Sequence, residues 1–470
     1  MDNVTHTLAG LLLADGALQL RRRRTGRPAG GRLRAVAAIT GAVGANLPDV
    51  DVLYTTLRGD RLTYLLHHRG HTHTVVVALL GALALWGVAR WRLGARADAE
   101  RGDPADAGAA GGWLLALALV AVASHILLDW TNGYGVHPFW PASNAWHFGD
   151  AVFIAEPWLW AVAVPPLLFA AHRRGVRVGL ALVLAAGLAL TWSVSLVARP
   201  AALAVTLGAA AMLLLAWRVR GLGRAAVGIA GWLLVELTFF AGMRGARARF
   251  AGVDAVDVVV APAPANPFCA GAIVVERTIA ADGGAPAYRL TTATAASAPG
   301  VVPAARCAGG SDHAAPRTLP MRAAARDDRT GVVWHQTWEA PLAELAALAR
   351  GNCVAAAALR FMRVPFWIAA DGDAFVLGDL RFDRAPGLEF AELLVPRAPA
   401  TCPRHVPPWT PPTAALLAAH EAEAAGAARG VALSRAGSAP AAASRRAPRR
   451  RSSASRRRSA PGRSASPAAR

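Results

Sequence analysis

The sequence contains no lysine, so all 50 of its basic side chains are arginine, and they face only 30 acidic side chains. A formal net charge of +20 ordinarily indicates nucleic acid or anionic lipid as a partner. Here one residue type carries the whole positive charge and alanine is very abundant, which indicates a compositional bias. We therefore do not expect nucleic acid as a partner.

Cysteine is scarce as well. The four cysteines include no C-x-x-C pair, which argues against a zinc ribbon, and all of them follow the last long apolar run: Cys269, Cys307, Cys353 and Cys402. Two disulfides in an exported domain and four unremarkable thiols both fit this pattern. A basic segment ahead of the first apolar stretch is also missing, so we do not expect a cleaved signal peptide.

Charged side chains make up only 17% of the chain and apolar ones 54%, with a mean hydropathy of +0.33. This composition is typical of a membrane protein. Six apolar runs approach the ~20 residues that a helix needs to cross a bilayer, at residues 74–91, 113–129, 151–171, 178–197, 201–217 and 225–243. Two shorter runs, 7–20 and 33–46, precede them, and we predict that these form a half-inserted helical hairpin.

The arginines are distributed unevenly over the predicted loops. If each apolar segment crosses the membrane once, the loops on one side carry 17 arginines and those on the other side only 4, up to residue 243. The positive-inside rule puts the arginine-rich side in the cytoplasm. We therefore predict that residues 244–395 lie outside the cytoplasm, where disulfides also persist.

The second half of the chain changes to a soluble pattern. It contains strand-like runs at 255–260, 272–276, 332–334 and 374–377 and a helical run at 342–350. We predict a mainly α fold: a polytopic membrane helical bundle in residues 1–243, a small mixed α/β soluble domain in 244–395, and a disordered basic tail in 396–470. Such arginine-serine tails are usually solvated, and binding of nucleic acid or anionic lipid is the less favoured interpretation.

The most unusual stretch is residues 67–74, which read His-His-Arg-Gly-His-Thr-His-Thr directly before an apolar run. Neutral imidazole is the commonest protein ligand of zinc, and histidines two to five residues apart can bind one ion. A solvated polar loop is the simpler interpretation of a single histidine pair. Four histidines within seven positions favour a metal site.

Further acidic and imidazole groups fall at the same predicted membrane face. His6 lies at the start of the first short run, and Asp49 and Asp51 follow a proline that ends the second. His125 and Asp129 are four residues apart, so both project from one helix face. Ionisable groups are costly at such positions and therefore suggest function, although His125 alone also fits a core histidine bonded across helices.

Three or more imidazoles with two or three carboxylates form the ligand set of a hydrolytic zinc or mixed divalent centre. A metal ion lowers the pKa of bound water toward 7 and so makes hydroxide available. We expect a carboxylate that is not a ligand, Asp51, to accept the proton and Arg69 to hold an anionic substrate.

These motifs in order resemble the YdjM/YfhP family of inner-membrane proteins, which carries a metal-dependent hydrolase label. The resemblance lies in residues 1–6 with Gly10, in 48–51, in 67–74, and in 125–129 with Tyr134, Gly135 and Pro141. Weaker similarity at 266–268, 361–366 and 378–382 extends it to about residue 395. The chain departs from the family pattern at His71, where an aliphatic residue is usual, and at Thr74, where serine is usual.

The resemblance implies a metal shell and two catalytic residues beside it, Asp51 and Arg69. The implied ligands are His6, Asp49, His68, His73, His125 and Asp129. Whether His71 is an added ligand stays open. The implied protein is a multi-pass inner-membrane hydrolase with a divalent metal as cofactor, zinc being the expected ion, and a site outside the cytoplasm.

The location of this site at the lipid boundary favours a lipid-linked or phosphate-ester substrate over a soluble peptide. The alternative is a non-catalytic membrane scaffold that binds a metal or a partner. An open coordination position would favour the enzyme, whereas a closed shell of four ligands would favour the scaffold.

Overall fold

The computed structural model describes residues 1–94, 104–279, 284–308, 318–423 and 425. Residues up to His420 form one compact unit, and residues 421–470 form a second unit of which only the first few residues are described. The predicted disordered tail lies largely outside the described residues.

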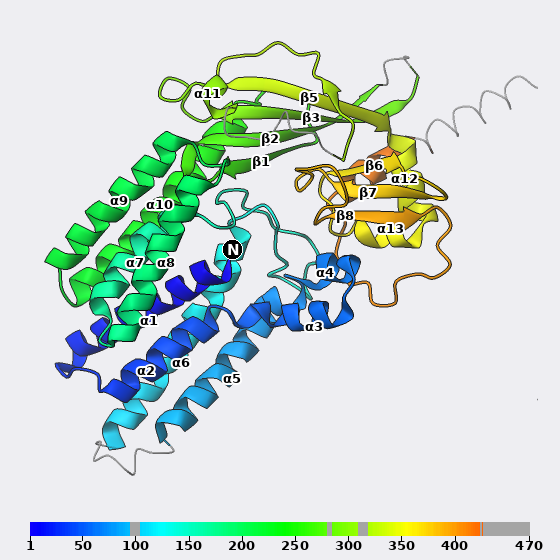
Figure 1. Cartoon of the computed structure of the whole chain (residues 1–470). Coiled ribbons are helices and arrows are strands. Elements are labelled where there is room, and N and C mark those ends of the chain that lie inside the picture. Colours follow the sequence, from blue (N-terminus) through cyan, green and yellow to red (C-terminus); the bar gives the residue numbers. More distant parts are fainter. Residues whose placement is uncertain (95–103, 280–283, 309–317, 424, 426–470) are drawn as a thin grey trace, which may run out of the picture. The chain divides into compact units, whose positions relative to one another are not determined.

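Eight longer helices make up the first half of the chain (Figure 1). They are α1 (Asn3–Thr25), α2 (Gly31–Gly44), α5 (Val75–Gly94), α6 (Pro104–Trp130), α7 (Pro157–Ala170), α8 (Arg174–Ser193), α9 (Arg199–Arg218) and α10 (Leu222–Ala248). Between α2 and α5 the chain forms four short helices, η1 (Leu47–Val50), α3 (Asp51–Arg58), α4 (Arg61–His67) and η2 (His71–His73). The predicted helical part is thus confirmed.

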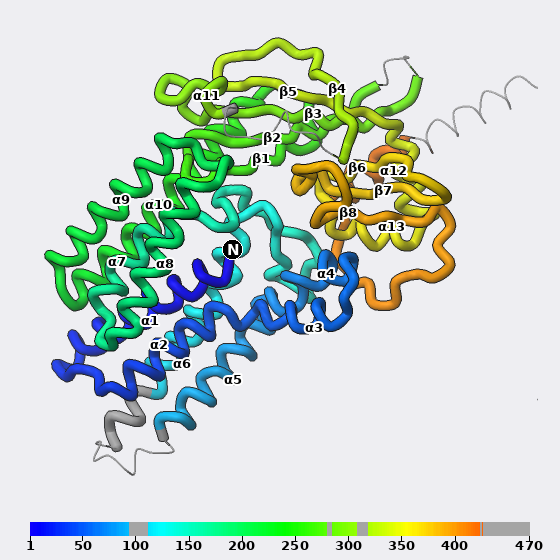
Figure 2. The backbone as a smooth tube through the Cα atoms, in the orientation of Figure 1, coloured from blue at the N-terminus to red at the C-terminus, as the bar shows by residue number. Residues whose placement is uncertain are grey.

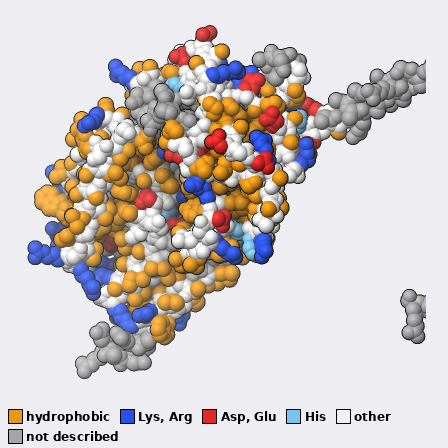
Figure 3. All heavy atoms as spheres, turned by 45° about the vertical axis from the view of Figure 1, so that its right-hand side comes forward, with side chains coloured by type: hydrophobic (Ala, Val, Ile, Leu, Met, Phe, Trp, Pro, Cys, Tyr) orange, Lys and Arg blue, Asp and Glu red, His pale blue; other side chains and the backbone are white. Residues whose placement is uncertain are grey.

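Five of these helices are long and apolar enough to cross a membrane, within α5, α6, α8, α9 and α10. Apolar side chains cover much of the helical surface that Figure 3 shows, as expected of helices that face lipid. A sixth span is possible by length if α2 and the 47–58 segment are counted together, although they meet at a bend of 63°.

The predicted span at residues 151–171 is wrong in length. Its helix, α7, has only 14 residues, because residues 151–156 are not helical. Glu156 caps α7 by accepting a hydrogen bond from the Trp158 backbone N–H, and proline follows at the first helical position. The chain therefore contributes a short apolar helix to the bundle here, where we had predicted a complete crossing.

The helix α1 is longer than the apolar run that predicted it. It continues through the four consecutive arginines at 21–24 and ends at Gly26, which adopts a left-handed conformation with φ 70°. The pairing of α1 with α2 depends on Gly10 and Gly41, because a Cβ atom on either one would collide with the other's carbonyl group. Small residues allow such close helix contacts in membranes.

The second half of the chain contains two antiparallel sheets. The first has the order β1 (Asp257–Ala263), β2 (Asn266–Ile279), β3 (Pro286–Ala296), β5 (Val332–Pro341) and β4 (Arg322–Ala323). The second has the order β6 (Pro365–Ala369), β7 (Ala374–Asp379) and β8 (Glu392–Pro396). Three short helices accompany them, α11 (Ala304–Ala308), α12 (Leu342–Gly351) and α13 (Cys353–Ala358).

All four predicted strands and the predicted helix are present. The strands β3, β4, β6 and β8 were not predicted; β3 contains mostly alanine and threonine, which give little hydrophobic alternation. Its threonines are buried nevertheless, because β3 lies between β2 and β5 in the sheet.

The sheets are held to the loop that follows α6. Arg363 makes ion pairs of 2.8 Å with Asp150 and 2.7 Å with Asp257, and Trp146 donates a hydrogen bond to the Arg360 carbonyl. The chain after residue 396, which we had placed in the tail, is also packed: Trp409 is fully buried. The boundary predicted at residue 396 is therefore wrong, because the packed segment continues to His420.

All four cysteines are paired, Cys269 with Cys307 and Cys353 with Cys402. We expect alkylation of protein taken directly from cells to label no cysteine until a reductant is added. Replacing Cys353 with serine should expose one reactive thiol at Cys402 and lower the free energy of unfolding by about 2–4 kcal/mol. Mass mapping of non-reduced peptides checks the pairing, and free thiols in untreated protein would contradict it.

Candidate metal centre

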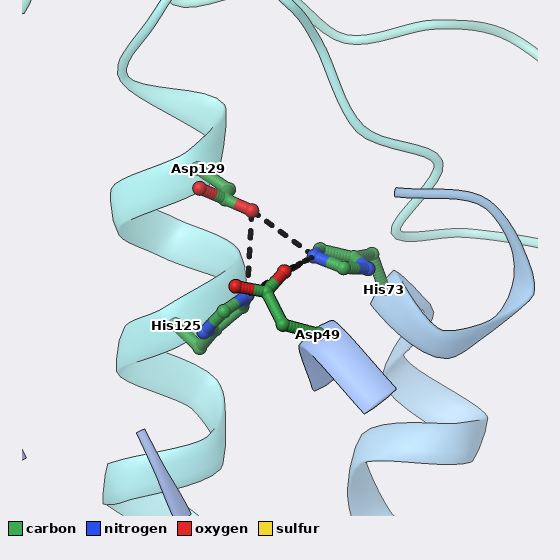
Figure 4. Close-up of side chains that lie close together, drawn as sticks. All are labelled: Asp49, His73, His125 and Asp129. Carbon is green, nitrogen blue, oxygen red and sulfur yellow. Dashed lines mark hydrogen bonds and ion pairs between the residues drawn. The ribbon is translucent and has the colours of Figure 1, made fainter. Parts of the chain in front are cut away.

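Four side chains from three separate elements converge at one point (Figure 4). Asp49 comes from η1, His73 from η2, and His125 and Asp129 from adjacent turns of α6. Pro48 lies at the start of η1, directly before Asp49. His125 and Asp129 share a helix face, as their spacing predicted, with 3.3 Å between His125 Nε2 and Asp129 Oδ2.

The four potential ligand atoms, one from each of these side chains, are spaced as a single metal ion would require. His73 Nε2 lies 3.0 Å from both His125 Nε2 and Asp129 Oδ2, and Asp49 Oδ1 lies 3.5 Å from His73 Nε2 and 3.4 Å from His125 Nε2. Nitrogen and oxygen ligands at the usual zinc distances occupy the corners of a tetrahedron with edges of about 3.3 Å. Five of the six edges agree with that value to within a few tenths of an ångström.

The orientation of both imidazoles also fits a metal site. His125 Nδ1 donates to the Ala45 carbonyl oxygen at 2.6 Å, and Nε2, the other ring nitrogen, lies at the centre. His73 Nδ1 lies 3.1 Å from Thr72 Oγ1 and 3.5 Å from Asp51 Oδ2. Metal-binding histidines are commonly fixed in this way through the ring nitrogen that faces away from the ion.

The local charge indicates a need for a cation. Burial opposes the charged form of His73, but the nearby carboxylates of Asp129, Asp49 and Asp51 outweigh it and raise the pKa of His73 to about 10. Asp49 Oδ1 is buried without a hydrogen-bond partner among the described residues. A divalent ion would satisfy this oxygen and balance the carboxylates, so the residues fit the metal that the motifs imply.

Arg69 lies against the Asp129 carboxylate and is almost completely buried. Its Nη2 is 2.9 Å from Asp129 Oδ1, its Nη1 donates to Asn132 Oδ1, and the guanidinium lies over the Tyr134 ring. The backbone of Arg69 has φ 58°, a left-handed value that is uncommon for residues other than glycine. Its Nε has no partner among the described residues and remains available for a ligand.

Both oxygens of Asp51, the carboxylate that we predicted to accept the proton, have partners in the structure. Its Oδ1 lies 3.0 Å from His68 Nδ1, and its Oδ2 accepts hydrogen bonds from the Arg69 backbone N–H and the Thr72 hydroxyl. Asp51 therefore holds the histidine loop in place, on the side of His73 that faces away from the centre. With Asp49 and His68 it also forms a second group of potential metal ligands.

Of the histidines outside the four-residue group, His6 lies beside it and His71 does not. His6 Nε2 is 3.2 Å from Asp129 Oδ1, where the amino group of Met1 also binds, and its ring stacks on His125. His71 instead lies against Trp140 and Trp409, and neither group of potential ligands includes it. The structure thus separates His71 from the histidines directed at the centre.

Three residues that build the site were not among the predicted site residues: Thr72, Asn132 and Trp409. Asn132 and Thr72 fix Arg69 and His73 through the hydrogen bonds described above, and only their proximity to the motifs hinted at them.

Trp409 donates to the Leu66 carbonyl at 2.8 Å and stacks on His137 with ring centres 3.8 Å apart. The His405 carbonyl also lies 3.0 Å from His67 Nε2, where the C-terminal segment (orange) passes α4 in Figure 2. No local pattern connects residues that are more than 300 positions apart.

Residues 1–202 match the family model described as YdjM inner membrane protein. The match confirms the resemblance predicted from the motifs for this part of the chain, and it contains every residue of the centre. Residues 203–395, to which the resemblance was predicted to extend, lie outside it. No curated protein and no solved structure matches the chain.

We predict that alanine at His73, His125 or Asp129 removes the metal, because a site of four ligands loses affinity steeply when one donor is lost. His71→Ala is the matched control, since it removes a neighbouring histidine that lies outside both ligand groups. Metal content of the purified variants, measured by elemental mass spectrometry after equilibration with zinc, checks this. Metal retained by His73→Ala and His125→Ala would contradict the proposed centre.

Proposed function

We propose that this chain is a multi-pass inner-membrane hydrolase that depends on a divalent metal ion held by Asp49, His73, His125 and Asp129. The observation that carries this proposal is the position of Arg69 beside these ligands. A site that only held an ion would not require a second, strained cation with an unpartnered N–H buried next to it. In an enzyme, this cation would bind an anionic substrate.

Each residue has a distinct role in this proposal. The two imidazoles and two carboxylates would hold the ion, which when bound supplies Lewis acidity and makes water nucleophilic near neutral pH. Arg69 keeps Asp129 in place through Nη2 and offers Nε to the substrate anion. Asp51 fixes the His73 ring and the Arg69 backbone, so it is a positioning residue.

Zinc is the ion that we propose. Imidazole nitrogens with carboxylate oxygens in a tetrahedral arrangement suit Zn²⁺, whereas Mg²⁺ and Ca²⁺ prefer six or more oxygen ligands. The substrate class follows from Arg69, because a guanidinium pairs with phosphate or carboxylate groups. A lipid-linked or phosphate ester is proposed because the ligands lie at the ends of apolar helices.

The specific alternative is a metal-binding scaffold without catalytic activity. One observation favours it: the four donors already complete a tetrahedral shell, which is typical of structural zinc sites. The two proposals differ in what Arg69 does. In the scaffold it would only neutralise Asp129, and replacing it would affect stability without affecting any reaction.

We propose that the metal centre and both sheets face away from the cytoplasm. Support comes from the arginines, which lie at the ends of α1 and α9 and within residues 171–177. The metal centre lies at the other end of the helices, near the start of α1 and the end of α6. The sheets follow the end of α10, which brings the chain back to the side of the centre.

This orientation predicts the behaviour of fusion reporters in cells. A reporter enzyme that is active only outside the cytoplasm should be active when fused after Asp257 and inactive when inserted between α5 and α6. The expectation rests on the excess of arginine at the helix ends that lie opposite the metal centre. The reverse pattern of activity would place the metal centre at the cytoplasmic face.

The catalytic proposal is tested with zinc-loaded protein and a panel of phosphate and carboxylate esters. Asp51→Asn should bind zinc about 10- to 100-fold more weakly, because it loosens His73, yet it should fill at high zinc. At saturating zinc, its turnover should still be lower by roughly 10²-fold, since Arg69 is misplaced.

Arg69→Gln separates the two proposals. It should raise KM for anionic esters more than it lowers zinc binding, because it removes the substrate contact and leaves the four ligands. Absence of turnover in the zinc-loaded wild-type protein for every ester, with intact zinc binding, would favour the scaffold.

A further inference from the structure

A second site lies at the opposite end of the helices from the metal centre. It is a cavity of about 420 Å³ lined by residues of α1, α2, α7, α8 and α10, and we call it the arginine cavity. Its wall includes Arg22, near the end of α1, whereas His6 of the metal centre is near the start of the same helix. Sixteen helical residues separate these two positions by about 24 Å, so the two sites are distinct.

The arginine cavity is strongly cationic on one side. Four arginines line it, contributed by three different helices and one loop: Arg22, Arg34, Arg220 and Arg224. Asp15 is the only acidic residue among the described residues that line the cavity. Asp15 also accepts a hydrogen bond from Gln19 at 3.1 Å. The cavity therefore has a clear excess of positive charge.

Two of these arginines are held in place before any ligand binds. Arg224 donates through Nη1 to the Phe169 carbonyl at 2.7 Å and through Nε and Nη2 to the Val219 carbonyl. These bonds use three of its five N–H groups and leave two available. Arg34 Nη1 lies 3.2 Å from His172 Nε2, which ties α2 to the chain between α7 and α8. Fixed donors bind an anion at a lower entropic cost than mobile ones.

The other side of the cavity is apolar. Four leucines of α1, α7 and α8 line it: Leu11, Leu18, Leu167 and Leu180. Of these helices, α8 is long and apolar enough to cross a membrane, and α7 is a shorter apolar helix. The cationic side lies at the level where α9 ends at Arg218 and α10 begins at Leu222. Arginine side chains (blue) gather along this lower-left edge of the helical part in Figure 3. The cavity thus combines a cationic side with an apolar side, as a site at the boundary between headgroups and hydrocarbon would.

We propose that the arginine cavity binds an anionic phospholipid, with the phosphate on the arginines and an acyl chain along the leucines. Guanidinium groups pair with phosphate oxygens, and basic pockets between membrane helices bind anionic headgroups. The volume lies within the range of ligand pockets, about 300–1,000 Å³. The apolar side distinguishes this ligand from a free phosphate compound, which would leave the leucines without a partner. The lipid is a resident ligand here, separate from any substrate of the metal centre.

The test uses the full-length protein in mild detergent, titrated with phosphatidylglycerol and followed by native mass spectrometry. The double variant Arg34→Gln/Arg220→Gln should bind this lipid about 30-fold more weakly, because each arginine near an anionic lipid contributes roughly fivefold in affinity. The matched control is Arg58→Gln/Arg199→Gln, which removes two exposed arginines at the other ends of the helices and should leave the affinity unchanged.

Two further measurements distinguish the proposed lipid from other ligands. Phosphatidylcholine should bind at least tenfold more weakly than phosphatidylglycerol, and glycerol 3-phosphate should not displace the lipid. Equal binding of the two lipids, full displacement by glycerol 3-phosphate, or unchanged binding by the double variant would each overturn the proposal. Zinc content is measured on the same samples and should be unchanged, so that failure of the metal centre is distinguished from failure of the lipid site.

Discussion

The carboxylate of Asp129 is the group on which the centre depends. It is fully buried at the end of a membrane-spanning helix, where an unpaired charge would be very costly. Arg69, His6 and the amino group of Met1 contact one of its oxygens, and His73 and His125 contact the other. Removing one partner of such a buried charge costs about 3–5 kcal/mol. Each element that reaches Asp129 is therefore held to α6 by charge.

The fold supplies these partners from two directions. The helices α1 and α6 bring His6, His125 and Asp129 together within the bundle. The loop of residues 67–74 has no regular structure beyond η2, so its shape depends on contacts from outside. Asp51 holds it from one side, and Trp409 of the C-terminal segment packs against it from the other. Ligands on a loop bind tightly only when such contacts restrict the loop.

The chain separates two chemistries along its helices. Imidazoles and carboxylates gather at one end, and arginines gather at the other, where they surround the arginine cavity. By the positive-inside rule, the arginine-rich end is the one expected in the cytoplasm. The two proposed sites, one for a cation and one for an anion, thus lie at opposite ends of the helices.

The amino-acid sequence by itself determined most of the elements that carry the centre, and it placed Asp49, His73, His125 and Asp129 among six candidate ligands. Helical periodicity put His125 and Asp129 on one face, and the apolar runs located the helices, because backbone hydrogen bonding within lipid permits few alternatives. Only the tertiary structure decided which of the clustered histidines are directed at the centre, that the oxygens of Asp51 are occupied, and which cysteines pair. Each of these results depends on contacts between distant parts of the chain. For the histidines, Trp409 contacts Leu66 and His71. Local sequence contains no record of such contacts, since they arise only when α4, α6 and the C-terminal segment pack together.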